Sequence, residues 1–281
     1  MGGVGRLTLA STSPLRYPGS KRKLVYDIAR HIPPGTQTLV EPFCGGASVS
    51  LGLLELGVVE QVVLGDADGL IAAFWREAAF NAEKLIDAMY REPVALDRWD
   101  YWRATHPLNQ HEQALKALFL NRTTFSGIIN SRRSGPIGGR AQVSKYKIDA
   151  RFNKDTLATR LRHICDLASS GRIHDVHHAD WETTLSTSHD LPRRALYLDP
   201  PYVDEADRLY AHSGMNHERL AERLREIEAP WVLSYDDHPS VRSMYADMTV
   251  LAPDHAYSMS RKQGRELLIV GADAAAHRRV A

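Results

Sequence analysis

The stretch TQTLVEPFCGGASVSLGLLELGVVEQVVLGDAD, residues 36–68, predicts the fold of this chain. The short apolar run TLVEPF is typical of a strand. The glycine turn CGGAS follows it and opens into an apolar segment that predicts a helix ending at Gly57. A second apolar run, EQVVLG, then ends on the acids Asp66 and Asp68. Strand, glycine turn, helix and strand in this order indicate a βαβ unit.

The rest of the chain alternates in the same way, with one interruption. Ser20 stands before a helical pattern that ends at the Pro-Pro-Gly of residues 33–35, and we expect its hydroxyl to cap that helix. Residues 69–125 are mostly helical in pattern, residues 126–150 are glycine-rich and basic without periodicity, and 153–168 is helical again. Further strand-like and helical segments cover 172–181, 194–202, 216–229, 230–237, 240–248 and 266–272. The pattern predicts an α/β domain formed by 1–70 and 163–281 and interrupted by a mainly helical, basic insertion, 71–162.

Composition limits the function classes. The chain has 281 residues, 43% of them hydrophobic and 25% charged, which suits a globular protein with a substantial core. It contains no apolar run long enough for a membrane span or a signal peptide. Its two cysteines provide no disulfide framework. We therefore expect a cytoplasmic protein.

Charge is distributed unevenly along the chain. The formal net charge is +1, but residues 121–162 hold ten arginines and lysines against two aspartates, a balance of +8 that leaves −7 for the remainder. Such asymmetry is typical of a basic surface for a polyanion on a neutral body, although a solvated charge run has the same composition.

The acids that follow the strand-like runs are candidate ligand-binding residues. Asp66 lies 20 residues past Gly46, where an acid can hold both hydroxyls of a ribose. The full Gly-x-Gly-x-x-Gly pattern of dinucleotide sites is absent, so a nucleoside-type ligand such as S-adenosylmethionine fits better. A surface aspartate after a turn is the structural alternative.

A second acid ends the run ALYL at Asp199, and Pro200, Pro201 and Tyr202 follow it. In open α/β sheets ligands bind beyond the carboxyl ends of the strands. Prolines donate no N–H, so this corner presents two acceptors, the Asp199 carboxylate and the Pro200 carbonyl, beside the flat face of Tyr202. Two acceptors near a planar face suit an amino group on an aromatic ring. A rigid turn with Tyr202 in the core is the alternative.

Two further segments contain residue types that occur in functional sites. RYPGSK, residues 16–21, places Tyr17 and Lys21 around a turn. HDVHH, residues 174–178, has the composition of a metal site, but no His-Glu-x-x-His and no second ligand group accompany it. We interpret these histidines as surface residues and expect no metal.

RYPGSK, EPFCGGAS, LGDAD and LDPPY, in this order, together with FLNRTTFSGIIN (residues 119–130), resemble the deoxyadenosine methylase (Dam-like, D12 class) family of DNA adenine-specific methyltransferases. The resemblance spans residue 14 to about residue 270. It implies a Rossmann-like S-adenosylmethionine-dependent methyltransferase fold with an inserted, mainly helical target-recognition domain. It also implies methyl transfer to the exocyclic amino nitrogen of an adenine flipped out of duplex DNA.

The family's site residues carry over by motif. Tyr17 and Lys21 would contact S-adenosylmethionine, and Phe43, Gly45 and Gly46 would line its methionine end. Asp66 would hold the ribose and Asp180 would address the cofactor's adenine. The catalytic corner, Asp199, Pro200, Pro201 and Tyr202, would hold the target base, with Asp199 also near the sulfonium.

Residues 132–154 differ from the recognition loop of the family members that read GATC, so the recognised site stays open. We expect DNA contacts from the basic residues Arg122, Arg132, Arg133, Arg140, Lys145 and Lys147. Other activities that the motifs leave open are an RNA adenine or protein glutamine methyltransferase and a catalytically silent DNA-binding component of a restriction system. We expect a monomer or weak dimer, nucleoid-associated in a bacterium or phage-encoded, with a restriction endonuclease partner left open.

Overall fold

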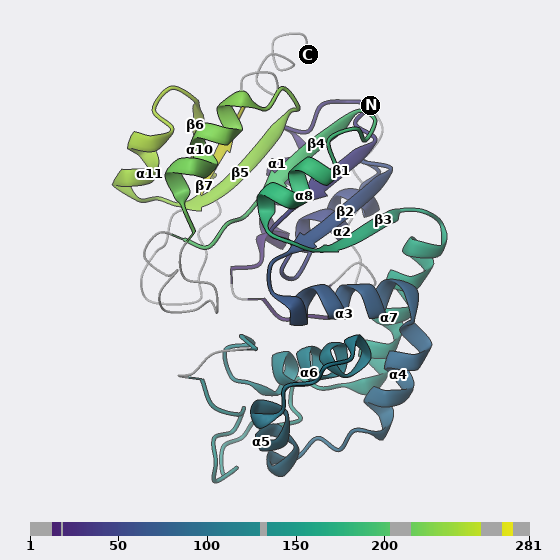
Figure 1. Cartoon of the computed structure of the whole chain (residues 1–281). Helices are drawn as coiled ribbons and strands as arrows, with labels where there is room; N and C mark the ends of the chain where they lie inside the picture. The colour runs from purple at the N-terminus through teal and green to yellow at the C-terminus, as the bar shows by residue number, and fades with distance from the viewer. Residues whose placement is uncertain (1–12, 18, 130–133, 203–214, 254–265, 272–281) are drawn as a thin grey trace.

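The computed structural model describes residues 13–17, 19–129, 134–202, 215–253 and 266–271. Within them, seven strands form one sheet in the order β3-β2-β1-β4-β5-β7-β6 (Figure 1). The strands are β1 (Thr38–Glu41), β2 (Gln61–Asp66), β3 (Ile173–His178), β4 (Arg194–Leu198), β5 (Trp231–Asp236), β6 (Thr249–Leu251) and β7 (Glu266–Val270). The first five are parallel, and β7 pairs antiparallel with both β5 and β6. The predicted Rossmann-like α/β fold is confirmed.

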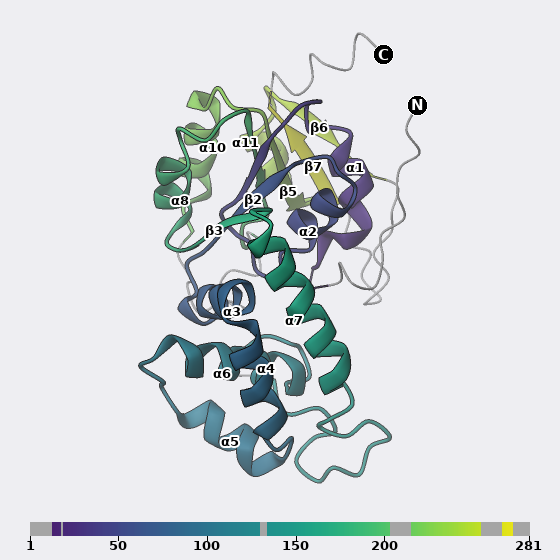
Figure 2. The ribbon, with the colours of Figure 1, turned by 90° about the vertical axis from the view of Figure 1, so that its right-hand side faces the viewer.

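The central strands consist of nearly continuous apolar residues because helices cover both faces of the sheet. The short 3₁₀ helix η1 (Lys21–Leu24), α1 (Val25–Ala29) and α2 (Ser48–Glu55) lie on one face. Helices α8 (Trp181–Thr187), α10 (His217–Glu226) and α11 (Pro239–Met244) lie on the other (Figure 2). Each face has its own core cluster. Leu39 and Val62 pack with the first group of helices, whereas Leu196 and Leu233 pack with the second.

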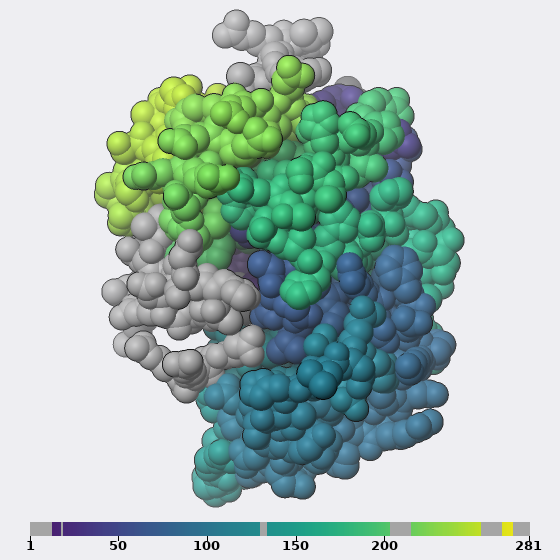
Figure 3. Space-filling view, in the orientation of Figure 1, coloured from purple at the N-terminus to yellow at the C-terminus, as the bar shows by residue number. Residues whose placement is uncertain are grey.

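Residues between β2 and β3 form the helices α3 (Gly69–Phe80), α4 (Ala82–Arg91), α5 (Leu96–Ala104), α6 (Gln110–Thr123) and α7 (Lys154–Ser169). Side chains at the N-termini of three of them, Asp68, Asn109 and Asn153, accept backbone N–H groups and so fix where these helices begin. In the space-filling view this blue and teal segment forms the lower part of the molecule, directly against the part that carries the sheet (Figure 3).

The helical segment shares its core with the sheet. Leu39 of β1, Trp75 of α3, Phe119 of α6 and Leu161 of α7 belong to a single buried cluster. The predicted boundary at residue 163 also falls inside the continuous helix α7. The division into a catalytic domain and an inserted recognition domain therefore stays a prediction.

Some local predictions were wrong. Ser20 makes no capping hydrogen bond; its hydroxyl instead lies 2.7 Å from the Ser48 hydroxyl at the start of α2. The helix expected after it is divided into η1 and the short α1. Helix α8 and strand β6 were not expected. The short segment of α8 carries too little periodicity to be recognised, and its N-terminus is fixed by the side chain of Asp180.

Candidate active site

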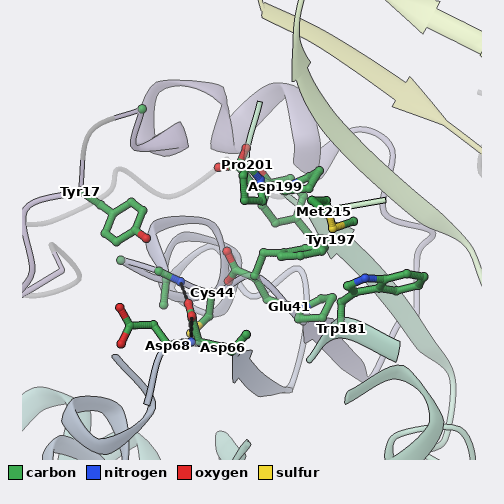
Figure 4. A pocket seen from close by; sticks show the side chains of 18 of the residues that line it. Tyr17, Glu41, Cys44, Asp66, Asp68, Trp181, Tyr197, Asp199, Pro201 and Met215 are labelled. Carbon is green, nitrogen blue, oxygen red and sulfur yellow. Dashed lines mark hydrogen bonds between the residues drawn. The ribbon is translucent and has the colours of Figure 1, made fainter. Parts of the chain in front are cut away.

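The candidate site lies where the strand order reverses. Strands β1 and β4 are neighbours, and the chain leaves them in opposite directions along the sheet, a topology that opens a crevice beyond their carboxyl ends. A cavity of about 620 Å³ lies there. In Figure 4, Tyr17 and Trp181 lie on opposite sides of it, while Asp199 and Asp66 lie at opposite ends. The apolar runs of β1, β2 and β4 thus place the residues that follow each strand around one space.

The glycine turn after β1 is held on three sides. The Gly45 N–H donates to Asp66 Oδ2 at 2.9 Å, and the Gly45 carbonyl accepts the Trp75 indole N–H at 2.8 Å. The Tyr17 ring covers the turn so closely that a Cβ on Gly45 would lie 2.9 Å from its Cζ, and one on Gly46 would lie 3.0 Å from its Cβ. Gly45 also has φ +44°, in the left-handed region. Tyr17 therefore leaves no room for a side chain at Gly45 and little room for one at Gly46.

Asp66 ends β2 and is already bonded to the backbone. Its Oδ2 accepts from Gly45, and its Oδ1 accepts the Asp68 N–H at 2.9 Å. Burial, the largest effect, raises the pKa of Asp66 to about 7 against the lowering effect of these two hydrogen bonds. Asp68 also lines the cavity and caps α3 by accepting the Leu70 N–H at 2.9 Å. Two carboxylates therefore stand at this end of the site.

Glu41, the last residue of β1, forms part of the cavity lining and is 3% exposed. Its Oε2 accepts the Ser50 N–H at 3.2 Å and also the Ser50 hydroxyl. Burial raises the pKa of Glu41 to about 8, and the nearby Asp199 and Asp66 carboxylates add to the rise. A carboxyl group that titrates near neutral pH thus lies between the two ends of the site.

Asp199 follows β4 at the other end. Lys21 Nζ lies 2.9 Å from its Oδ1 and 3.0 Å from its Oδ2, and the Ser234 hydroxyl of β5 donates to Oδ1 at 2.9 Å. Behind Ser234, the fully buried Tyr197 hydroxyl lies 2.8 Å from the serine oxygen. Since the carboxylate only accepts, Ser234 donates to it and Tyr197 donates to Ser234. The carboxylate is therefore fixed in orientation before any substrate arrives.

Tyr202 is held by a residue of the antiparallel strand β7. Its hydroxyl donates to Glu266 Oε1 at 2.6 Å, and Lys21 Nζ lies 3.4 Å from the same oxygen and 5.0 Å from the centre of the Tyr202 ring. Burial raises the pKa of Glu266 to about 7, with Lys21 opposing and Asp199 adding to the rise. Pro200 is buried and Pro201 is half-buried, and both line the cavity.

The remaining wall is formed by Phe43, Trp181 and Met215 together with a charged pair. Arg219 of α10 donates to Glu182 of α8 at 2.9 Å. Asp180 lines the cavity beside them, but its Oδ1 accepts the Thr183 N–H at 2.8 Å and caps α8. Asp180 therefore has a structural role in capping α8, independent of any contact with a ligand.

The lining favours a cationic ligand with an aromatic part. Among the described residues around the cavity are six carboxylates, Glu41, Asp66, Asp68, Asp180, Glu182 and Asp199, and two cations, Lys21 and Arg219. S-adenosylmethionine, which carries a sulfonium, an amino group, ribose hydroxyls and an adenine ring, fits this set of acceptors and aromatic walls. In the described part of the chain, no three His, Cys, Asp or Glu side chains are grouped as metal ligands.

Comparison with known proteins identifies the family. A family model for D12 class N6 adenine-specific DNA methyltransferases matches residues 17–259, which is most of the chain. This chain belongs to that family. The Type II methyltransferase M.MjaIII of Methanocaldococcus jannaschii is similar to it, at 20% identity over 210 residues, covering 67% of this chain and 68% of the relative. The resemblance predicted from the motifs is confirmed.

The residues expected to bind cofactor and base in this D12 methyltransferase come together in the structure. Tyr17, Lys21, Phe43, Gly45, Gly46, Asp66, Asp180, Asp199, Pro200, Pro201 and Tyr202 all line the one cavity. Their individual roles stay predictions.

The residues expected to contact DNA differ in exposure where the structure describes them. Arg122 is buried, and its Nε donates to the Pro14 carbonyl at 2.6 Å, so its expected place on an exposed basic surface was wrong. Helical packing, which a charge count cannot detect, takes it inside. Arg140 is exposed and pairs with Asp100 at 2.7 Å, and Lys145 and Lys147 are exposed. Arg132 and Arg133 lie outside the described residues.

Sequence reasoning missed several residues of this D12 site. Glu41 and Asp68 stand inside the motifs EPFCGGAS and LGDAD, and the signal that identified Asp66, an acid at the end of an apolar run, was also present for them. Ser234 and Glu266 carried no local signal because they reach Asp199 and Lys21 only through strand pairing.

No helix within the described ranges is both long and apolar enough to cross a membrane.

Proposed function

We propose that this protein transfers the methyl group of S-adenosylmethionine to the exocyclic amino nitrogen of an adenine in duplex DNA, at a specific sequence. The observation that carries the proposal is one cavity at the strand-order reversal that holds both the Asp199-Pro200 corner and the glycine turn with Asp66. The membership of the chain in an adenine-specific family supports it.

The cofactor would be held along the floor of the cavity. Tyr17 and Phe43 would contact it beside the glycine turn, and Asp66 would accept from the ribose hydroxyls. When bound, it supplies an electrophilic methyl group on a positively charged sulfur, and breaking the sulfur–methyl bond leaves the neutral thioether of S-adenosylhomocysteine. The acidic lining of the cavity favours that charge.

The Asp199 carboxylate and the Pro200 carbonyl would accept the two N–H groups of the adenine amino nitrogen. The lone pair of that nitrogen is delocalised into the ring and is a poor nucleophile. Two acceptors on the same side of the nitrogen would favour a tetrahedral geometry and localise the lone pair. Because Ser234 and Lys21 already fix Asp199, most of the rate enhancement would come from positioning and electrostatics. Asp199 would accept the proton that the nitrogen then loses.

An adenine inside duplex DNA must be flipped out before its amino group can enter this cavity, at a cost of a few kcal/mol. Tyr202 is half-buried at the cavity wall, and stacking on its ring would offset about 1–3 kcal/mol of this. The hydrogen bond to Glu266 keeps the Tyr202 ring from rotating away.

Radiolabelled S-adenosylmethionine offered with duplex DNA, RNA and a protein lysate tests the proposal. We expect label in DNA, released as N6-methyladenine on digestion, and none with the Asp199→Ala variant. Label in RNA or in a glutamine of the lysate would instead support the other activities, and no label anywhere would support a silent DNA-binding component.

A further inference from the structure

We propose that Glu266 is a positioning residue for the methyl transfer: it holds the Tyr202 ring and shares Lys21 with Asp199, which leaves the Asp199 carboxylate able to accept from the target amino group. This inference rests on the proposed function and deepens it, because it concerns a residue outside the motifs that identify the family.

Lys21 is shared between Asp199 and Glu266. Its ammonium is 3% exposed and lies between two carboxylates, 2.9 Å from Asp199 Oδ1 and 3.4 Å from Glu266 Oε1. At this depth water does not screen the charges, so the position of the ammonium depends on the balance between the two acids. Both acids are themselves largely buried, with 25% and 13% of their side chains exposed.

The sharing of Lys21 affects how well the Asp199 carboxylate can accept further hydrogen bonds. A carboxylate has about four acceptor positions, and Asp199 already accepts from Ser234 and Lys21. If Glu266 were neutral, Lys21 would pair with Asp199 alone. That pairing would weaken the carboxylate as an acceptor and occupy a position that an adenine N–H needs. A negative Glu266 attracts the same ammonium, which lies 3.4 Å from Glu266 Oε1 and 2.9 Å from Asp199 Oδ1, and so weakens the pairing with Asp199.

Glu266 also binds the hydroxyl of Tyr202. The hydroxyl donates to the same Glu266 oxygen that faces Lys21, at 2.6 Å. One side chain therefore orients the ring on which the base would stack and also sets the charge around the acceptor that would hold the base. A purely structural acid would need only one of these contacts.

The sheet topology explains how Glu266 reaches the site. Glu266 is the first residue of β7, which runs antiparallel to β5, and it pairs with Asp236 at the carboxyl end of β5. An antiparallel strand begins where its parallel neighbours end, so its first residue lies beside their carboxyl ends. In a sheet whose last strands were parallel, this position would lie at the opposite edge.

Among the described residues, the charged and titratable groups that face Glu266 are Lys21 from η1, Tyr197 of β4, Asp199 and Tyr202 just after β4, and Asp236 across the strand pair. With its pKa held near 7 by burial, Glu266 is charged above neutral pH and loses its charge below it. Loss of charge would release Lys21 to Asp199.

Glu266→Gln tests the inference, because glutamine keeps the shape and an oxygen for the Tyr202 hydroxyl but removes the charge. We expect the single-turnover rate of methyl transfer to fall about tenfold or more. Dissociation constants for S-adenosylmethionine and for DNA should stay within about twofold. With both substrates saturating, wild type should lose rate as the pH falls through about 7, and the variant should lack that step. Glu60→Gln, an exposed acid far from the cavity, is the matched control and should behave as wild type.

An unchanged single-turnover rate and pH profile in Glu266→Gln would overturn the inference while leaving the proposed function intact. The proposed function fails separately, if wild type itself methylates no adenine. Should Glu266→Gln not fold, Tyr202→Phe replaces it, since it keeps the ring and removes only the hydroxyl bound to Glu266. A slower transfer at unchanged affinities then supports the inference, and a wild-type rate contradicts it.

Discussion

At the residue scale, the acids of the cavity differ in how they are held. Asp66 is bonded to two backbone N–H groups, Glu41 to Ser50, and Asp199 to the side chains of Lys21 and Ser234. Backbone bonds fix a carboxylate for structural reasons as well as for binding. Side-chain bonds that converge from η1 and β5 on one corner of the cavity favour a role for Asp199 in the reaction.

Asp199→Ala should abolish methyl transfer, with activity lowered at least about a thousandfold, the scale of losing a transition-state hydrogen-bond acceptor in a dry site. The protein should stay folded, because Lys21 keeps Glu266 as a partner at 3.4 Å. Single-turnover assays with circular dichroism on the same samples check this. A variant with wild-type turnover would refute the role of Asp199.

Asp66→Ala should weaken binding of S-adenosylmethionine by about 1.5–3 kcal/mol, the value of charge-assisted hydrogen bonds. DNA binding without cofactor should change little, since Asp66 lies at the end of the cavity opposite Asp199. Calorimetric titration measures both. Asp68→Ala is the informative comparison, because Asp68 caps α3 and does not accept the Gly45 N–H. Equal affinity for S-adenosylmethionine in Asp66→Ala and wild type would reject the ribose role of Asp66.

At the scale of elements, the β1–turn–α2 unit holds Glu41, whose pKa is raised further than that of Asp66, the other cavity carboxyl group with a raised pKa. Glu41 ends β1 in the cavity wall, and Ser50 in the first turn of α2 donates to it from both its backbone N–H and its hydroxyl. Because the folded protein raises the pKa of Glu41 to about 8, folding favours its protonated form. The folded state then binds more protons than the unfolded state between about pH 4.5 and pH 8, so stability falls as pH rises through this window.

Glu41→Gln should remove that fall, since glutamine stays neutral and can still accept from Ser50. One unit of pKa shift corresponds to 1.36 kcal/mol, so the gain at pH 8 has an upper limit of roughly 5 kcal/mol, and we expect about 1 kcal/mol or more. At pH 5 variant and wild type should be nearly equal. Urea unfolding at the two pH values measures the difference, and a variant that is less stable at both would contradict this account.

At the scale of the whole molecule, the sheet part carries the candidate chemistry. The segment between β2 and β3 carries the basic excess, most of it in residues 124–153 between α6 and α7. The two parts share one buried cluster, which would keep any DNA bound by the helices in a constant position relative to the cavity. This arrangement favours recognition by the helical segment and reaction in the cavity on the same duplex.

Arg140→Ala should weaken binding to all DNA sequences alike and lower the slope of log affinity against log salt by roughly 0.9. Arg242→Ala is the control, because Arg242 also pairs with an aspartate, Asp237, but in the sheet part of the chain. Fluorescence anisotropy at several salt concentrations gives both slopes. Equal slopes in the two variants would place the DNA elsewhere.

Arg132 and Arg133 precede the glycine-rich stretch SGPIGG, and we expect at least one of them to contact a guanine edge. Replacing that arginine with alanine should relax preference at one position of the recognised site by about 1–3 kcal/mol. Methylation profiling over randomised sites measures the preference. Wild-type preference and salt slope in both variants would show that this segment does not touch DNA.

The amino-acid sequence by itself determined the features that depend on neighbours along the chain. The period of apolar residues, the glycine turn after β1 and the acids after β2 and β4 are local, so they predicted the βαβ unit, the class of fold and the residues Asp66 and Asp199. The order of the motifs added the family, which the comparison confirmed.

Only the tertiary structure decided which distant side chains meet. Strand pairing brings Ser234 and Glu266 to Asp199 and Lys21, and helix packing buries Arg122 and turns the Ser20 hydroxyl to Ser48. In each case the partner lies far away along the chain. The free energy of such a contact depends on the burial and charge that the assembled fold creates around it, and neither quantity is present in the local pattern of residues.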